Sequence, residues 1–226
     1  MRKIVTLLLF TLITTGVFAE KVAVISKTRG DVLLRKVDTP DYNQSVTIGT
    51  LLEKYDQIKV NDGFAVMLLL DDQSQFKLRE NTEVAITMVE NVSGADYRIR
   101  LDYGQALTKF RTIPGTGFHI TTPTSVVSVK GTSFWTISDP ETGDNVIVLD
   151  GVVDVMNNLT GATSTASAGQ SVRSTPDGKI QTAPTMEGTV PQDPEESSKV
   201  IDENHSKRDL GFILGLVMVI LFAAIL

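Results

Sequence analysis

The sequence predicts an all-β protein with many short antiparallel strands in a rolled, partly solenoid-like or sandwich β domain. Runs of alternating apolar and polar residues recur through the middle of the chain, most clearly at residues 97–103, and a period of two is typical of half-buried strands. Glycine-containing turn signals separate these runs at short intervals. Between the two ends of the chain, no long run has the 3.6-residue period of an amphipathic helix.

The first strands are expected at residues 22–25 and 31–36, on either side of Arg29-Gly30. The next two runs, 57–60 and 64–70, flank Asn61-Asp62-Gly63, which is a tight-hairpin signal. Residues 64–70 are continuously apolar, so we expect this strand to be buried on both faces. Alternating strands follow at residues 75–79, 83–88 and 97–103.

The strongest strand signals lie between residues 122 and 155. Residues 124–130 are rich in β-branched side chains, which suit a half-buried sheet. Residues 146–149 and 152–156 are apolar and are joined by Asp150-Gly151, a second tight-hairpin signal. Glycines 30, 104 and 151 each precede a short apolar strand. Tight turns at similar offsets are expected to stack on one another, as a rolled β structure or a sandwich would allow.

Three segments resemble the FecR-domain family of bacterial envelope proteins. They read TPTSVVSVKGTSF at 122–134, VLDGVVDV at 148–155 and AGQSV at 168–172. Weaker segments upstream, IKVNDGFAV at 58–66 and LDYGQALTKF at 101–110, extend the resemblance over most of the middle of the chain. The positions that match the family motif are Thr122, Pro123, Val129, Lys130, Gly131, Thr132, Phe134, Gly151 and Gly169.

The resemblance implies a non-enzymatic regulatory or sensory module on the extracytoplasmic side, periplasmic or at the cell surface, that binds an envelope protein partner. Better-known family members carry a cytoplasmic anti-sigma segment ahead of this domain. Only 19 residues precede it here, so the resemblance implies the extracytoplasmic module without that segment. The alternative is a structural or glycan-binding component of the cell envelope.

Composition divides the chain into four segments. Residues 1–19 have the positive start, apolar middle and small cleavage-site residues of a signal peptide, so the mature β domain is expected over residues 20–175. Residues 176–209 contain four of the eight prolines and a cluster of acidic residues, and we expect them to be a flexible tether. Residues 210–226 carry no charge and are predicted to form a C-terminal transmembrane helix that anchors the domain.

Two details of the ends leave alternatives open. Residues 1–19 could be retained as a membrane anchor rather than cleaved. Lys207 and Arg208 would lie on the outer side of the membrane, which opposes the positive-inside rule. Within the C-terminal helix, Gly211 and Gly215 form a G-x-x-x-G pair, a candidate for helix self-association and hence for a homodimer.

The composition argues against several classes of function. The chain has 21 Lys and Arg against 27 Asp and Glu, a net charge of −6 that suits nucleic acid poorly. The chain contains no cysteine, which excludes disulfides, thiolate metal sites and cysteine nucleophiles. Its two histidines, His119 and His205, are far apart in the sequence, and no serine lies in a nucleophile-elbow motif. We therefore expect no metal, no cofactor and no catalysis.

Adjacent residues of a strand face opposite sides, so Phe134 and Trp135 are expected to differ in burial. Phe134 matches the aromatic position of the family, which places it in the core. Trp135 is then expected to be at least partly exposed, as a candidate contact residue for a partner. The parity of Val127 and Val129 favours the opposite assignment unless a β-bulge near Gly131 resets the register.

Overall fold

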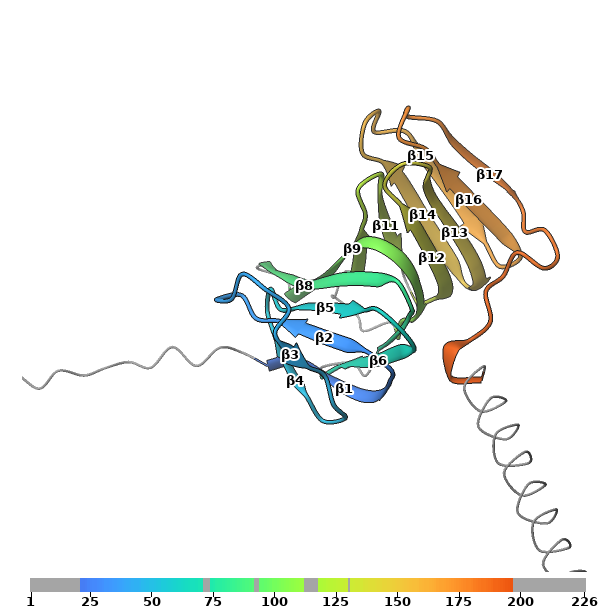
Figure 1. Cartoon of the computed structure of the whole chain (residues 1–226). Helices are drawn as coiled ribbons and strands as arrows, with labels where there is room; N and C mark the ends of the chain where they lie inside the picture. Colours follow the sequence, from blue (N-terminus) through green and yellow to red (C-terminus); the bar gives the residue numbers. More distant parts are fainter. Residues whose placement is uncertain (1–20, 71–73, 92–93, 112–117, 130, 197–226) are drawn as a thin grey trace, which may run out of the picture.

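The computed structural model describes residues 21–70, 74–91, 94–111, 118–129 and 131–196 of the 226-residue chain. This part of the chain forms seventeen β-strands (Figure 1). Their bounds are β1 Lys21–Arg29, β2 Val32–Arg35, β3 Gln44–Ser45, β4 Leu51–Glu53, β5 Gln57–Val60, β6 Phe64–Leu69, β7 Gln75–Arg79, β8 Thr82–Asn91, β9 Gly94–Lys109, β10 Phe118–Thr121, β11 Ser125–Val129, β12 Ser133–Asp139, β13 Gly143–Asp150, β14 Val152–Asn157, β15 Thr163–Ser167, β16 Gln170–Ser174 and β17 Ile180–Pro184. The predicted signal peptide and C-terminal helix, including Gly211 and Gly215, lie outside the described residues.

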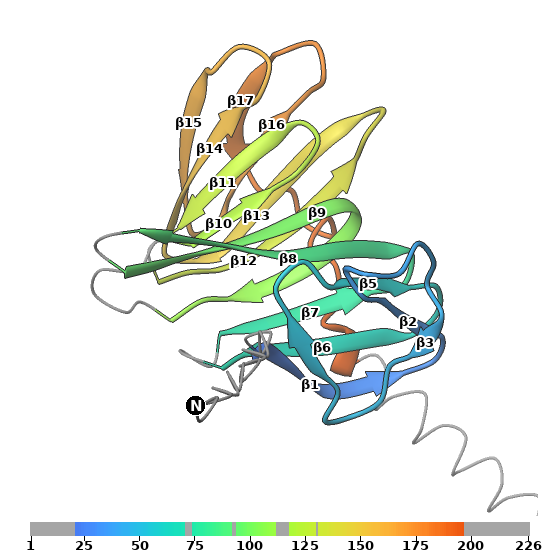
Figure 2. The same cartoon turned by 90° about the vertical axis from the view of Figure 1, so that its left-hand side faces the viewer.

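The strands form two layers that share one strand (Figures 1 and 2). Sheet A has the order β4-β1-β6-β7-β9-β12-β13-β16-β17. Sheet B has the order β3-β2-β5-β8-β9-β10-β11-β14-β15. All these pairs are antiparallel except β9 with β10, which is parallel. The predicted all-β class with mainly antiparallel strands is confirmed.

β9 is the central strand of both sheets. Its first part pairs with β8 and β10 in sheet B, and its last part pairs with β7 and β12 in sheet A. The strand bends at Gly104, whose φ is 105° and where a Cβ would lie 2.4 Å from Thr82 Oγ1. Glycine therefore permits both the backbone angle and the close approach. All earlier strands lie on one side of β9 and all later strands on the other, so the chain rolls outward in both directions from this strand.

Two turns that the sequence predicts to be hairpins connect strands of different sheets. Asn61-Asp62-Gly63 links β5 in sheet B to β6 in sheet A, and Asp150-Gly151 links β13 in sheet A to β14 in sheet B. The hairpin prediction is therefore wrong at both turns. Each neighbouring strand pairs with strands elsewhere in the chain, a choice that the turn residues alone do not encode.

The expected stacking of glycine turns is present. At Gly151, where φ is 82°, a Cβ would lie 2.6 Å from Thr132 Cγ2 and 2.8 Å from the carbonyl oxygen of Gly131. The corner between β13 and β14 thus packs directly on the corner between β11 and β12. Corners that pack in this way hold together the two sheets that they connect.

The main hydrophobic core fills the space between the two sheets. Its largest fully buried side chains include Phe76, Phe118 and Phe134. The rings of Phe76 and Phe118 are 5.2 Å apart, and Phe110 stacks on Phe118 at 4.8 Å. Because these residues come from β7, β10 and β12 and from the position directly after β9, one core connects both sides of the central strand.

The folded domain extends past the boundary at residue 175 that the sequence analysis places before the tether. β17, Ile180–Pro184, pairs with β16 in sheet A, and the residues up to 196 lie on the same sheet. The composition argument considered only apolar side chains. A short polar segment can still add a strand, because the open edge of β16 offers backbone hydrogen bonds. Residues 197–209 of the predicted tether lie outside the described residues.

Candidate interaction surface

One row of directly paired residues runs across the outer face of sheet A. Paired residues of neighbouring antiparallel strands point to the same face, and none of the row's large apolar residues belongs to the core between the sheets. We call these residues the sheet A row: Lys27, Val66, Lys77, Leu107, Trp135, Ile147, Ser171 and Ala183.

The middle of the sheet A row is inaccessible to solvent. The exposed fraction is 2% for Val66, 6% for Lys77, 3% for Leu107, 1% for Trp135 and 0% for Ile147. Leu107, Trp135 and Ile147 form a second hydrophobic cluster, separate from the main core. An outer face of an antiparallel sheet is commonly solvated on that side, so another part of the chain must cover this one.

The cover is the segment of residues 185–196, which we call the strap. Figures 1 and 2 both show it leaving β17 and crossing sheet A to the region of β7 and β1. Near its start, Met186 and Thr189 line a pocket with Asn145 of β13 and Ser171 of β16. Near its end, Asp193 and Glu195 contact β1, β7 and β9.

The distance between these two ends determines the path of the strap. Measured across sheet A, the pair β13–β16 and the pair β7–β9 are about three strand spacings apart, or roughly 14 Å. Four residues of extended chain, such as those from Thr189 to Asp193, span at most roughly 14 Å. The short path between the two ends therefore crosses β12, the strand that carries Trp135.

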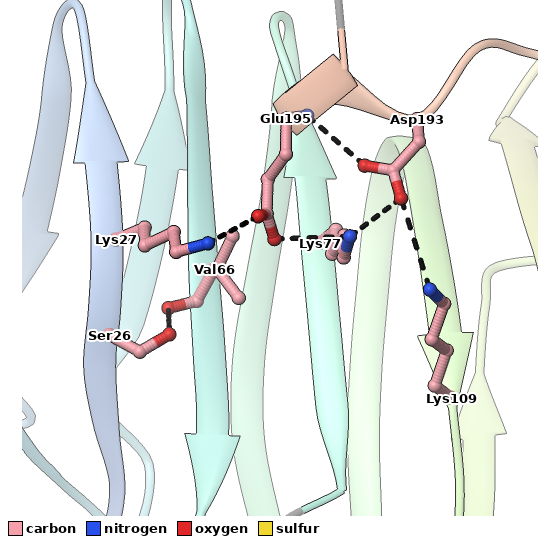
Figure 3. A network of polar contacts seen from close by, with 7 residues as sticks. All are labelled: Ser26, Lys27, Val66, Lys77, Lys109, Asp193 and Glu195. Atoms are coloured by element: carbon pink, nitrogen blue, oxygen red, sulfur yellow. Dashed lines mark hydrogen bonds and ion pairs between the residues drawn. The ribbon is translucent and has the colours of Figure 1, made fainter. Parts of the chain in front are cut away.

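Figure 3 shows the polar end of the strap, where two carboxylates meet three lysines of the sheet. Lys77 Nζ donates to Asp193 Oδ2 at 2.6 Å and lies 3.0 Å from Glu195 Oε1. Lys27 Nζ donates to Glu195 Oε2 at 2.5 Å. Lys109 Nζ is 3.9 Å from Asp193 Oδ2. Lys77 joins both carboxylates, so it is the centre of the network.

Within this network, the lysines and the carboxylates shift each other's pKa values towards the charged forms. Burial alone would lower the pKa of Lys77, but the hydrogen bonds from its ammonium to Asp193 and Glu195 outweigh this effect and raise the pKa. Burial alone would also raise the pKa of Glu195, but hydrogen bonds from Lys27 and Lys77 outweigh it and lower the pKa. Each group thus stabilises the charged form of its partner at neutral pH.

The structure corrects the prediction for Trp135. Phe134 lies in the core as expected, together with Val127 and Val129. Val127 and Val129 belong to β11 in sheet B, and the chain enters sheet A at the corner around Gly131, so the alternation does not continue from β11 into β12. The register shift opposite Ser133 and Phe134 lies on β13, where Leu149 is the extra residue. Trp135 does face the opposite side, yet it is fully buried. The parity argument assumed that this side meets solvent, whereas the strap covers it.

The outer face of sheet B carries a different row. Its paired residues are Thr87, Arg98, His119, Ser128, Asp154 and Thr165, and we call them the sheet B row. All six side chains are polar, and each is partly or fully exposed. His119 Nδ1 lies 2.9 Å from Ser128 Oγ, and Thr165 Oγ1 donates to Asp154 Oδ1 at 2.6 Å. His119 is therefore part of a solvated polar surface.

Thr122, the first motif position, lies in a buried polar cluster at one end of the sandwich. Its Oγ1 donates to Asp144 Oδ2 at 2.5 Å and accepts from the backbone N–H of Ser125 at 2.8 Å. Ser138 Oγ donates to Asp144 Oδ1 at 2.7 Å. Because Asp144 is completely buried, these hydrogen bonds offset the cost of removing its carboxylate from water. Thr122 thus holds strand ends of the two sheets together.

The other described motif positions also serve the framework. Val129 and Phe134 lie in the main core, while Gly131, Thr132 and Gly151 form the stacked corners described above. Gly169, with a φ of 81°, forms the turn between β15 and β16, and Pro123 is exposed beside Thr122. Lys130 lies outside the described residues. The structure therefore places most of the motif at corners, in turns and in the core. The carbonyl oxygen of Gly169 also accepts a hydrogen bond from the backbone N–H of Thr185, the first residue of the strap, at 2.9 Å.

Residues 56–154, from the start of β5 into β14, match the family model described as "FecR protein". This region belongs to the FecR family. The resemblance that the motif segments predicted is confirmed. The matched FecR region contains Lys77, Leu107, Trp135 and Ile147 of the sheet A row, whereas Lys27 and the strap lie outside it.

Two crystal structures, at 2.50 and 1.65 Å resolution, of a protein titled "putative anti-sigma factor from Parabacteroides distasonis ATCC 8503" resemble this chain. Each is 19% identical, with a TM-score of 0.47, and the match covers 57% of this chain. The match spans 59% of that protein's length. No curated protein matches the chain.

The described residues contain neither a membrane-spanning helix nor a metal-binding cluster. None of the helical segments there has the length and apolar character needed to cross a membrane. The same residues contain no group of three or more His, Cys, Asp or Glu side chains placed to hold a metal ion.

Proposed function

We propose that this FecR-domain chain is a non-enzymatic regulatory module of the bacterial cell envelope that binds another envelope protein. The observation that carries the proposal is the match of residues 56–154 to the FecR family. Trp135 on the outer face of sheet A supports it, because aromatic residues are enriched in protein interfaces.

The location of the module is part of the proposal. Residues 1–19 would direct export, and residues 210–226 would anchor the domain from the extracytoplasmic side of the membrane. Residues 197–209 would then connect the strap to the anchor.

Crosslinking in native membranes tests this function. The full chain, carrying an affinity tag, is crosslinked in its host, solubilised in detergent and purified, and the attached proteins are identified. The expected result is a defined envelope protein at a fixed stoichiometry. A matched sample without crosslinker identifies proteins that copurify nonspecifically.

Two other outcomes would contradict the proposal. Retention of the chain by purified cell wall, without a crosslinked protein, would favour the structural or glycan-binding alternative. Export failure of a reporter fused after residue 19 would contradict the proposed location.

A further inference from the structure

The strap shows what kind of segment the sheet A row accepts. Over the apolar part of the row the strap has no regular secondary structure, and it includes Val190, where the backbone bends, and Pro191. It then presents two carboxylates, Asp193 and Glu195, spaced two residues apart, to the three lysines. The row therefore accepts a short segment with an apolar start and an acidic end, and Asp193 caps the helical turn formed by residues 194–196.

The strap itself is held in a way that permits exchange. Met186 and Val190 remain substantially exposed, whereas Pro191 is partly buried and Pro194 is buried, so only part of the apolar surface of the strap is removed from solvent. Two of the three lysines it contacts, Lys27 and Lys109, are about half exposed. Ion pairs of exposed lysines contribute little free energy in water. Lys77 is the only deeply buried cation among the three, so most of the electrostatic attachment depends on it.

We propose that the sheet A row is a binding site for a short acidic segment of a partner protein, and that the strap occupies this site in cis until the partner displaces it. This inference rests on the proposed protein-binding function. The partner is assigned by charge complementarity: its segment carries carboxylates that replace those of Asp193 and Glu195 on Lys77. Displacement of the strap would expose Leu107, Trp135 and Ile147 to the incoming chain.

A partner must compete with the strap of the same chain for the sheet A row. Because the strap begins at β17 on the same sheet, its effective concentration at the row is on the order of millimolar. A free peptide at micromolar concentration should therefore bind poorly to the native chain. The same peptide should bind well when the native strap has lost its carboxylates.

Trp135 is the only tryptophan of the chain, so its fluorescence reports directly on the covered row. The probe is a labelled peptide with the sequence of residues 189–196, TVPQDPEE, and the control peptide is TVPQNPQE. Both are added to the full-length chain in detergent and to its Asp193→Asn/Glu195→Gln variant.

The variant should have red-shifted Trp135 emission and greater access to a soluble quencher. It should bind the acidic peptide at least tenfold more tightly than the native chain does, and binding should restore blue emission. The control peptide should bind at least tenfold more weakly. Adding Lys77→Gln to the variant should remove the preference for the acidic peptide, whereas adding Arg98→Gln in the sheet B row should leave it unchanged.

Native Trp135 emission in the variant, or equal binding of the two peptides, would overturn the proposal. Concentration-dependent dimers of the native chain that the acidic peptide dissociates would assign the site to a second copy's strap and overturn the assignment to a partner.

If the variant does not unfold cooperatively, hydrogen exchange on the native chain decides whether the peptide displaces the strap. Saturating acidic peptide should then accelerate exchange in residues 185–196, and unchanged exchange refutes displacement. A partner captured in membranes without peptide binding would refute this inference alone and leave the proposed function intact.

Discussion

The two outer faces of the sandwich have opposite characters. The sheet B row is polar and meets solvent, as the free face of an antiparallel sheet usually does. The sheet A row holds a tryptophan, two large aliphatic residues and a buried lysine beneath a strap. The comparison shows that covering one face of a sheet creates a second, small hydrophobic core. This core depends on the strap, which comes from the end of the domain.

The largest expected difference between the faces is in the cost of side-chain truncation. Trp135→Ala should lower the free energy of unfolding by about 3–5 kcal/mol, because it removes a large buried side chain and leaves a cavity. His119→Ala, at the sheet B row, should cost no more than about 1 kcal/mol. Chemical denaturation followed by circular dichroism measures both variants, and equal losses would mean that the two faces contribute alike.

A second comparison separates two lysines within the sheet A row. The side chain of Lys77 is 7% exposed and that of Lys27 is 57% exposed. Lys77→Ala leaves two carboxylates without their central cation and should cost up to about 3 kcal/mol, with detachment of the strap setting the limit. Lys27→Ala should cost less than about 1 kcal/mol. Trp135 quenching should increase strongly only for Lys77→Ala. Similar quenching in both variants would show that attachment of the strap does not depend mainly on Lys77.

As the pH falls, the strap should detach from the sheet A row before the sheet B row is affected. The pKa of Glu195 lies below its usual value of 4.5, so its contribution is present above that value and is lost as pH falls through the lower native value. The pKa of Lys77 lies above 10.5, so its contribution is lost only at higher pH. Trp135 emission should thus be constant from pH 4.5 to 10.5 and shift to the red in stronger acid.

The control for this titration is the far-ultraviolet circular dichroism of the same sample. It should remain native where Trp135 emission begins to shift, since only the strap detaches. Coincident changes in the two signals would mean that the strap and the sandwich unfold together.

The smallest effect is expected at the sheet B row. Asp154 is exposed and accepts one hydrogen bond, from Thr165. Asp154→Asn should therefore change the free energy of unfolding by no more than about 0.5 kcal/mol and leave Trp135 emission unchanged. A larger change, measured by chemical denaturation, would reveal that this face also supports the fold.

The alternating strands could be predicted because their pattern is local. The tight glycine turns were also located, but their role was not, since the choice between a hairpin and a corner depends on which distant strand offers a partner. The sheet A row was missed for the same reason, because its pairings join strands that are far apart in the sequence. One available signal was that Leu107, Trp135 and Ile147 are apolar at positions opposite in parity to the core residues Ala106, Phe134 and Val146.

The strap was missed for a different reason. Proline and acidic residues predict a disordered segment when the segment is considered alone. Here Asp193 and Glu195 find lysines presented by the sheet, and β17 finds the open edge of β16. Charge complementarity between two distant segments, together with the covered apolar row, is the evidence that composition cannot supply.

The central position of β9 has a consequence for folding of the domain during its synthesis. Until β9 is synthesised, β7 and β8 each have an open edge, and these edges lie in different sheets. A nascent or truncated chain that ends before Gly94 would thus present two sites for nonnative strand pairing at the same time. The arrival of one sixteen-residue strand closes both edges together. The first half of the domain should therefore be the part that needs protection from aggregation during synthesis.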